Sequence, residues 1–373
     1  MNNFEHLYIH WPFCRSKCFY CDFLSFCNLD NLSQEYNDIL CSQVKSFNNL
    51  NKIKTIFIGG GTPSIWPINL LEKFIIELKN NFDFSELKEF TIEANPADIT
   101  QDKLACWKNL GINRLSMGIQ VLDDNALSKV GRNQTVAQAI NAINLAQNYF
   151  DNISVDLILG LPGVDDNIWE NTLKIIASWP LKHVSVYLLT LYKKTKLFDL
   201  IKKNELFLLN DDMISDIYEK TVNFLELNNF MQYEISNFAK VGFESAHNMA
   251  YWDRKAYLGL GLGASSFDGT TRYINEKNLN NYLKIENSLL DFAQKENLTE
   301  QQVLLERLML ALRTKKGGDL HSMLYFLSDE KKQDFLKELN ELKNLGLIFV
   351  DGGNFYLTKK GFLLENEIVL KLI

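Results

Sequence analysis

Six short apolar runs, each followed by helix-like sequence, limit most narrowly how this chain can fold. The runs are LYIHWPF at 7–13, TIFIGG at 55–60, EFTIEANP at 89–96, RLSMGIQ at 114–120, SVDLILGLPG at 154–163 and HVSVYLLTL at 183–191. They are apolar almost throughout, which predicts strands that are buried on both faces. The helix-like segments lie near 32–48, 68–80, 101–109, 123–130, 135–149 and 166–177. This alternation predicts an α/β fold with a parallel sheet, and six units fall short of the eight in a closed barrel, so we expect a partial (β/α)6 barrel.

Polar residues and glycines gather where the predicted strands end. In a parallel barrel the carboxyl ends of the strands carry the chemistry. Glycines there let the backbone approach a ligand, because glycine has no Cβ atom. Each feature alone has an ordinary structural explanation, but six on one rim indicate a site. Strand by strand they are the cysteines of 14–21, the loop Gly59-Gly60-Gly61-Thr62-Pro63, Glu93, Gln120, Asp156 and Thr190.

Three of the six cysteines, Cys14, Cys18 and Cys21, lie within eight residues. The chain has no apolar run of membrane-spanning length and no signal-peptide pattern, so we expect a cytoplasmic protein without a disulfide framework. A structural zinc site would need a fourth ligand such as His10, which packing explains equally well. A 4Fe–4S cluster normally takes four thiolates, so three would leave one iron open to an outside ligand. The cysteines that follow no ligand spacing are Cys27, Cys41 and Cys106.

The C-x3-C-x2-C spacing, with Tyr20 just before the last cysteine, resembles the motif of the radical S-adenosylmethionine (SAM) superfamily. In that superfamily the amino and carboxylate groups of SAM bind the open iron of a 4Fe–4S cluster. An electron from the cluster then cleaves SAM to a radical. The resemblance therefore implies a 4Fe–4S cluster and SAM as cofactors, and a partial (β/α)6 barrel as the fold.

Further stretches narrow the resemblance. YIHWPFC, FIGGGTPS, RLSMGIQ, DLILGLPG and YEISNFA are together similar to the oxygen-independent coproporphyrinogen III oxidases and to the related heme chaperones called HemW, over almost the whole chain. The carboxylates suit ribose hydroxyls, and the arginine suits a carboxylate. By this likeness the SAM-contacting positions are Tyr8, Tyr20, Gly60, Gly61, Thr62, Glu93, Gln120, Arg132 and Asp156, with Thr190 aligned more loosely.

Three features separate the two branches of that family. The oxidases carry a further cysteine, which would fall at position 23, where this chain has Phe23. They also have a longer arm before the cluster motif. The stretch HNMAYW at 247–252 matches the H-N-x-x-Y-W motif of the chaperones. We therefore expect a chaperone that binds heme and delivers it to acceptor proteins. The alternative is the oxidase, which decarboxylates coproporphyrinogen III oxidatively to protoporphyrinogen IX.

His247 is the candidate heme ligand in the HNMAYW stretch. An imidazole can bind heme iron, and the aromatic residues that follow can pack on the porphyrin. An isolated histidine is more often structural, so this assignment depends on the family likeness. The chain departs from the chaperone pattern at Ser265, where relatives often have histidine, and in 189–198, which lacks a Glu-Pro-Gly run.

The alternation of strands and helices stops after about residue 290. Thr299 and Gln302 form a capping box that begins one predicted helix, and 330–346 predicts a second. LIFVDGGNFYLT at 347–358 predicts a hairpin. Helices followed by a hairpin suggest a small winged-helix-like domain. We expect a barrel at 1–240, a connection that carries HNMAYW at 241–290, and the C-terminal domain at 291–373.

The charge of the chain bears on its partners. The net charge is −7, which argues against nucleic acid because backbone binding requires a basic face. We expect heme and heme-accepting proteins as partners. Respiratory, membrane-associated proteins are a candidate class of acceptor, and a homodimer is a candidate assembly.

Overall fold

The computed structural model describes residues 4–47, 52–285 and 293–373. Its centre is a 12-stranded sheet in the order β14-β13-β12-β11-β1-β4-β5-β6-β7-β8-β10-β9. The six predicted strands pair in parallel, in chain order. The sheet is open, because its two end strands, β14 and β9, do not pair with each other. The predicted α/β fold with a partial (β/α)6 barrel is therefore confirmed. The six strands are β1 (His6–Trp11), β4 (Thr55–Gly60), β5 (Glu89–Ala94), β6 (Arg114–Gln120), β7 (Asn152–Leu159) and β8 (His183–Leu188).

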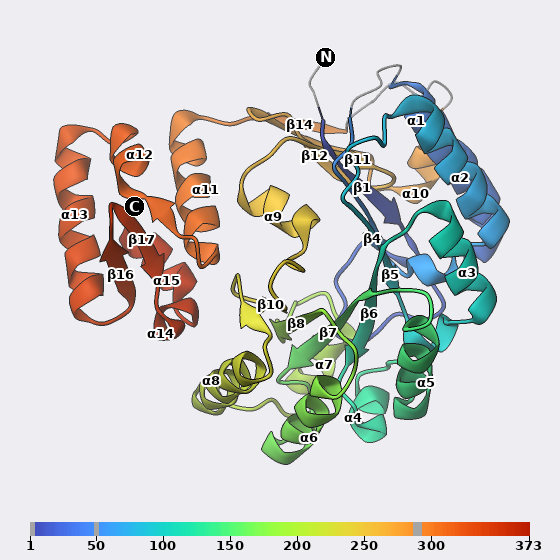
Figure 1. Ribbon diagram of the computed structural model, residues 1–373, viewed down its shortest axis with the longest axis horizontal. Coiled ribbons are helices and arrows are strands. Elements are labelled where there is room, and N and C mark those ends of the chain that lie inside the picture. The colour runs from blue at the N-terminus through green and yellow to red at the C-terminus, as the bar shows by residue number, and fades with distance from the viewer. Residues whose placement is uncertain (1–3, 48–51, 286–292) are drawn as a thin grey trace.

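Helices cover the convex side of this curved sheet (Figure 1). The six predicted helices all form, although residue 48, at the end of the first prediction, lies outside the described residues. Cys41 and Cys106 lie on the first and third of them. Their bounds are α1 (Ser33–Lys45), α2 (Ile68–Asn81), α3 (Gln101–Leu110), α4 (Asp124–Lys129), α5 (Val136–Ala146) and α6 (Asp166–Ala177).

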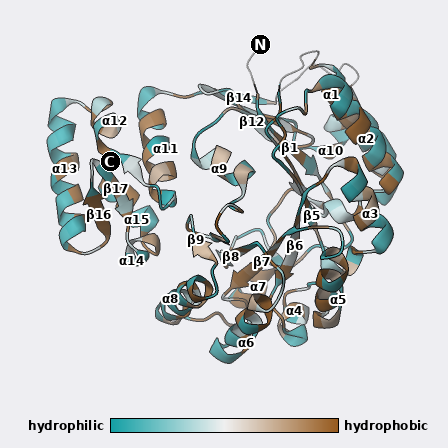
Figure 2. Ribbon diagram, viewed as in Figure 1, coloured by the Kyte–Doolittle hydropathy of each residue, from teal (hydrophilic) through white to brown (hydrophobic). Residues whose placement is uncertain are grey.

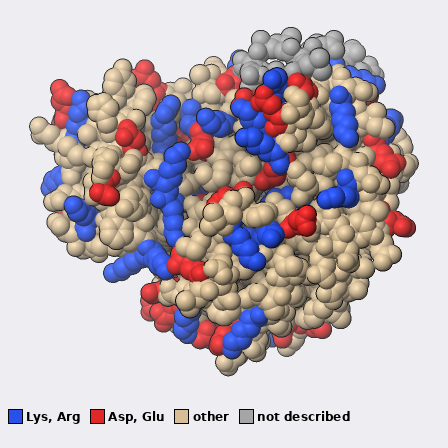
Figure 3. All heavy atoms as spheres, viewed as in Figure 1, with Lys and Arg blue, Asp and Glu red and all other residues tan. Residues whose placement is uncertain are grey.

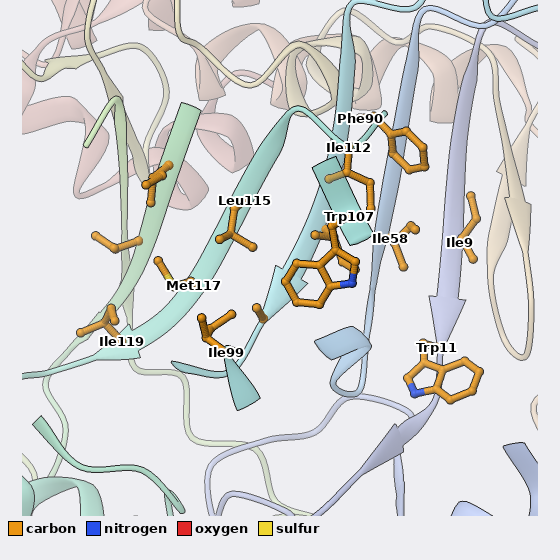
Figure 4. Close-up of a cluster of buried hydrophobic side chains, with 14 of the residues drawn as sticks. Ile9, Trp11, Ile58, Phe90, Ile99, Trp107, Ile112, Leu115, Met117 and Ile119 are labelled. Atoms are coloured by element: carbon orange, nitrogen blue, oxygen red, sulfur yellow. The ribbon is translucent and has the colours of Figure 1, made fainter. Parts of the chain in front are cut away.

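The two faces of the parallel strands differ in character, which the apolar runs did not show. Both faces are largely buried, as predicted. Because successive side chains point to opposite faces, Leu7 and Ile9 of β1 lie on the helix side, and His6 and His10 lie on the concave side. Figure 4 shows the apolar side, where residues of several strands pack with Trp107 of α3. The concave side instead carries the polar residues that form the site.

The chain then crosses from one edge of the sheet to the other. After α7 (Lys196–Lys202), α8 (Asp211–Leu227) and β9 (Met231–Gln232), strand β10 (Asn237–Ala239) pairs antiparallel with β8. Helix α9 (Ala246–Trp252) lies on the concave side (Figure 1) and leads to β11 (Tyr257–Leu260), which pairs in parallel with β1. This seventh parallel strand was not predicted. The edge continues through β12 (Ser265–Phe267), β13 (Thr271–Ile274), α10 (Leu279–Tyr282) and β14 (Gln294–Asn297).

The C-terminal elements have an apolar core of their own, formed by residues between 308 and 372. The predicted capping box, helices and hairpin are present, and Figure 2 shows the mostly hydrophilic α13 at the outer edge. Gly352 and Gly353 have φ angles of 56° and 83°, as a tight two-residue hairpin turn requires. The elements are α11 (Glu300–Arg313), β15 (Gly318–Asp319), α12 (Leu320–Tyr325), α13 (Asp329–Asn344), β16 (Ile348–Asp351), β17 (Asn354–Leu357), α14 (Lys359–Phe362) and α15 (Glu365–Lys371).

The predicted domain limits stay predictions. The limit at 240/241 falls between β10 and α9, and the strands that follow it join the same sheet as the barrel. The limit at 290/291 lies outside the described residues. In the part of the chain that the structure describes, none of the helices has the length and apolar character needed to cross a membrane.

Candidate functional site

A cavity of about 740 Å³, which we call the cysteine cavity, lies at the carboxyl ends of the parallel strands. It brings together nearly all the residues that the sequence placed on that rim. Tyr8 and His247 are not part of its lining. The predicted residues that line it are Cys14, Cys18, Tyr20, Cys21, Gly60, Gly61, Thr62, Glu93, Gln120, Arg132, Asp156 and Thr190.

The segment that carries the cysteines is held at both ends. The short strands β2 (Phe13–Cys14) and β3 (Phe26–Cys27) pair in parallel. His10 supports the segment from below, because its Nε2 lies 2.8 Å from the backbone oxygen of Leu24 and its Nδ1 lies 3.0 Å from the hydroxyl of Tyr8. Both ring nitrogens of His10 therefore have partners within the protein, and its place here is structural.

The three thiols suit a cluster. Thr62 donates a hydrogen bond to Sγ of Cys14 at 3.3 Å, and Arg132 donates one to Sγ of Cys18 at 3.5 Å. Burial raises the pKa of the Cys14 and Cys21 thiols, so a metal must displace their protons. Among the described residues, no three His, Cys, Asp or Glu side chains converge on a point where a single metal ion would bind. Thiolates of a 4Fe–4S cluster bind separate irons, so this donor set fits a cluster better than a lone zinc ion.

The glycine loop after β4 packs directly on the cysteine segment. Gly60 has a φ angle of 115°, which side chains other than glycine rarely adopt. A Cβ atom on Gly61 would lie 2.7 Å from the backbone oxygen of Phe13 and 3.0 Å from Sγ of Cys14. Glycine is therefore required at both positions for the loop to approach the thiols this closely.

Two half-buried carboxyl groups face the cavity from β5 and β7. Glu93 accepts a hydrogen bond from the N–H of Gly60 at 3.3 Å, and Asp156 accepts one from the hydroxyl of Ser116 at 3.1 Å. Burial, together with the nearby charge of Asp156, raises the pKa of Glu93 to about 8. Burial also raises the pKa of Asp156. Glu93 is therefore protonated at neutral pH and can donate a hydrogen bond to a polar ligand.

The end of β6 holds Gln120 in an unusual backbone conformation. Its φ angle is 68°, and the register with β7 shifts between Gly118 and Gln120. Arg132 donates to the backbone oxygen of Gly118 at 2.8 Å and so covers this irregular turn. A left-handed conformation at a residue other than glycine is uncommon, and such conformations cluster at functional sites.

Several cavity residues were missed by sequence reasoning. Asp98 accepts hydrogen bonds from Arg15 at 2.8 Å and from Ser64 at 2.9 Å, and Lys103 also lines this side. Asp98 could have been found, since it closely follows Asn95-Pro96 at the end of β5. The exposed apolar residues on the opposite side, which gave no sequence signal, are Tyr187, Leu188 and Tyr192.

The HNMAYW stretch forms α9, and its histidine is buried rather than free. His247 is only 1% exposed. Its Nδ1 lies 2.7 Å from the hydroxyl of Thr55, its Nε2 lies 2.9 Å from the hydroxyl of Tyr251, and its ring stacks on Phe57 with centroids 5.3 Å apart. Burial, with contributions from His6 and Arg114, lowers the pKa of His247 to about 3. His247 is therefore neutral at pH 7, with both nitrogens engaged.

Helix α9 is anchored to the starts of the strands, at the opposite end from the cysteines. Glu89, the first residue of β5, accepts hydrogen bonds from the N–H groups of Ala246 at 2.7 Å and His247 at 3.3 Å, and from the hydroxyl of Ser245 at 3.2 Å. A carboxylate satisfies the free N–H groups at the N-terminus of a helix and complements its dipole. This polar network was not predicted, since its members are far apart in sequence.

A partial parallel barrel, with three cysteines, a glycine loop and half-buried carboxyl groups on its carboxyl rim, defines a radical SAM protein. The family model described as the Radical SAM superfamily matches residues 8–176. The "Heme chaperone HemW" of Lactococcus lactis is 32% identical over 98% of this chain and 96% of that protein, and that of Bacillus subtilis is 34% identical over 97% of both. The chain belongs to the HemW family within the radical SAM superfamily.

A solved structure supports the fold. The coproporphyrinogen III oxidase (HemN) of Escherichia coli is described as a radical SAM enzyme, and its structure has a TM-score of 0.85 to this chain. The match covers 100% of this chain and 90% of the oxidase. Its sequence identity is 23%, so this likeness bears on the fold alone.

Proposed function

We propose that this protein binds heme and delivers it to acceptor proteins. The observation that carries the proposal is the similarity, over nearly the full length of both chains, to two proteins named heme chaperone. That similarity includes the segment of α9, which lies apart from the cysteine cavity and connects β10 to β11 of the sheet. We further propose a cytoplasmic location, respiratory membrane-associated acceptors and a homodimer as predictions that still need tests.

The cysteine cavity would hold a 4Fe–4S cluster and SAM. Cys14, Cys18 and Cys21 would bind the cluster, which when present supplies one-electron chemistry. Thr62 and Arg132 already donate to two of the sulfur atoms and would offset thiolate charge. The remaining predicted residues of the cavity would bind SAM. They are Tyr20, Gly60, Gly61, Glu93, Gln120 and Asp156. Tyr8 would act indirectly, through its contact with His10.

His247 stays our candidate for the axial ligand of heme iron. In the conformation described, a lone pair becomes free only if the hydroxyl of Thr55 or of Tyr251 moves away. Tyr251 lies one turn after His247 on the same short helix, whereas Thr55 lies on β4 in the sheet. Breaking the Tyr251 contact therefore requires a smaller rearrangement than breaking the Thr55 contact. Ligation through Nε2 after movement of Tyr251 is therefore the form of the proposal that we favour.

The alternative function is oxidative decarboxylation of coproporphyrinogen III. One observation favours this alternative: exposed aromatic residues line the cysteine cavity beside the thiols. Phe23, which stands where the oxidases carry a further cysteine, also lines this cavity and is 63% exposed. We regard this position as the main argument against the oxidase function.

One experiment separates the two functions. Purified protein, reconstituted with iron and sulfide without oxygen, is offered heme and coproporphyrinogen III in separate assays with reductant and SAM. We expect bound heme and unchanged coproporphyrinogen. Repeated turnover to protoporphyrinogen IX at an ordinary enzymatic rate, about one per second or more, without retention of heme would show that the protein is the oxidase.

A further inference from the structure

Cys27 has no role in the proposed cluster, although it lies directly beside the cluster thiols. In the pairing of β2 with β3, Cys27 is opposite Cys14. The N–H of Phe26 donates a hydrogen bond to the backbone oxygen of Pro12 at 2.8 Å, which holds the two strands together. Asn28, with a φ angle of 60°, ends β3 directly after Cys27. The two short strands therefore fix the backbone that carries both cysteines.

This pairing brings the two thiols within reach of each other. Neighbouring strands lie about 4.8 Å apart, and a disulfide joins Cα atoms that are about 4.4–6.8 Å apart. Opposite residues of a strand pair project to the same face, and Ser25, two residues before Cys27, lines the cysteine cavity together with Cys14. Both thiols are free in this structure. A disulfide between them requires rotation of the side chains and little movement of the backbone.

The two thiols differ in their access to solvent. Cys14 is 7% exposed and lines the cysteine cavity. Cys27 is half-buried and is not part of the cavity lining. A small molecule that arrives from solvent therefore meets Cys27 before Cys14. An accessible thiol with a second thiol behind it is the arrangement of an attacking and a resolving cysteine.

Lys17 gives this approach a preference for negative charge. On the face drawn in Figure 3, many Lys and Arg side chains lie beside Asp or Glu side chains. Lys17 instead donates a hydrogen bond to the backbone oxygen of Phe23 at 3.1 Å, and it forms no ion pair with a carboxylate of the described residues. Its charge acts on the thiolate of Cys27. An anionic molecule, such as a small disulfide that carries carboxylates, is therefore attracted to this thiol.

We propose that Cys27 and Cys14 form a reversible disulfide when the chain holds no cluster. The thiolate of Cys27 attacks one sulfur of an anionic low-molecular-weight disulfide, whose S–S bond breaks and releases a first small thiolate. The thiolate of Cys14 then attacks the sulfur of Cys27, and the mixed disulfide breaks and releases the second. The chain is oxidised by two electrons, the small disulfide is reduced to two thiols, and these take up the two thiol protons of the chain.

The disulfide would make loading of the cluster depend on the redox state of the thiols. It removes Cys14 from the three thiols that would bind the cluster, and it shields this sulfur from irreversible oxidation. A dithiol reductant breaks the disulfide and restores the thiol. Only this consequence rests on the proposed function, since the disulfide itself follows from the pairing of β2 with β3.

Peptide mapping tests the disulfide. Full-length protein without its cluster is treated with glutathione disulfide in the absence of oxygen, alkylated, and cleaved after Lys and Arg and before Asp. This cleavage leaves Cys27 in residues 22–29, apart from the two cysteines of residues 18–21 and from Cys14, which lies before Arg15. We expect the peptide of Cys14 joined to residues 22–29, and separate peptides after treatment with dithiothreitol. A link within residues 18–21, or from Cys14 to residues 18–21, in place of the expected one would overturn the proposal.

Two variants check the assignment of the link. Cys27→Ser should abolish it, and the cysteines that remain should be recovered alkylated. Cys106→Ser is the matched control, because Cys106 is a half-buried thiol on α3, on the convex side of the sheet. The control should form the link as the unaltered protein does. Loss of the link in Cys106→Ser as well would mean that the oxidised pair is not the one we propose.

Protection by the cluster separates this inference from the proposed function. Protein loaded with the cluster should show no link between Cys14 and Cys27 under the same treatment, and the link should form after a chelator removes the iron. If no link forms in the iron-free protein, the inference fails while the proposed cluster stands. If the link forms equally in loaded and iron-free protein, Cys14 does not bind the cluster, and control of loading by this disulfide is overturned.

Discussion

Individual thiols decide whether the cysteine cavity holds a cluster. Cys14 and Cys27 are opposite each other in the pairing of β2 with β3, yet only Cys14 lines the cavity. We expect Cys14→Ala, Cys18→Ala and Cys21→Ala to abolish the visible thiolate-to-iron absorption after anaerobic reconstitution, and Cys27→Ala to keep it. Iron analysis should give about four irons per chain for the unaltered protein. Loss of the cluster in Cys27→Ala alone, or zinc in place of iron, would contradict the assignment.

Glu93 gives the protein a pH dependence of known sign. Its pKa is raised in the folded state to about 8 from an ordinary value of 4.5. The folded state therefore holds this proton more tightly, and the stability it contributes is complete below pH 4.5 and is lost as pH rises to about 8. We expect the free energy of unfolding of the cofactor-free protein to fall by up to ~1.4 kcal/mol per pH unit across that window. Denaturant titrations at several pH values should show that the free energy of unfolding falls less with pH in Glu93→Gln than in the unaltered protein. If it falls equally in both proteins, the raised pKa of Glu93 is refuted.

In our proposal, Tyr251 controls whether His247 can bind heme iron. Its hydroxyl occupies Nε2 of His247. Tyr251→Phe removes that hydroxyl and keeps the ring, so we expect tighter heme binding with an imidazole signature in electron paramagnetic resonance. His247→Ala should weaken binding and shift the Soret band while the cluster content is unchanged. Spectra and affinities identical to those of the unaltered protein in both variants would show that His247 is structural only.

At the scale of elements, α9 is the piece whose position matters most. It is a seven-residue helix, too short to be stable alone, and Glu89 holds its N-terminus. Glu89→Gln keeps the shape and weakens this charge-assisted capping. We expect a loss of ~1–2 kcal/mol in the local stability of α9.

Hydrogen exchange can measure this loss directly. Amide protons of α9 should exchange faster in Glu89→Gln, whereas those of α5 and α6 should be unchanged. Asp165→Asn, which alters the cap of α6, is the matched control and should speed exchange in α6 instead. Uniformly faster exchange in Glu89→Gln would mean that Glu89 stabilises the whole barrel and not α9.

At the scale of the whole molecule, the sequence predicted what local patterns encode. The six strands, their helices, the capping box at Thr299 and the hairpin at Gly352 all depend on residues close together in the chain. The carboxyl-rim residues were also predictable, because parallel strands bring their ends to one edge. The spacing of Cys14, Cys18 and Cys21 predicted a cluster through its likeness to the radical SAM motif.

Long-range pairing was not predictable in the same way. Strand β11 pairs with β1 across about 250 residues, and its glycine-rich sequence carries little strand signal. The contact of His247 with Thr55 spans 192 residues of the chain, and α9 packs against the distant helix α11. No local pattern in the sequence encodes such contacts. From the sequence alone, His247 therefore seemed free to bind iron, whereas in the structure both of its ring nitrogens contact hydroxyl groups.

Delivery of heme to another protein can be measured by a transfer experiment. Protein reconstituted with its cluster is loaded with one equivalent of heme, freed of excess, and mixed with an apo form of a heme protein that has a distinct Soret band. We expect heme to pass to the acceptor while the iron and sulfide of the cluster stay with this chain. Failure to retain heme during loading, or retention without transfer together with conversion of coproporphyrinogen III, would contradict the proposed function.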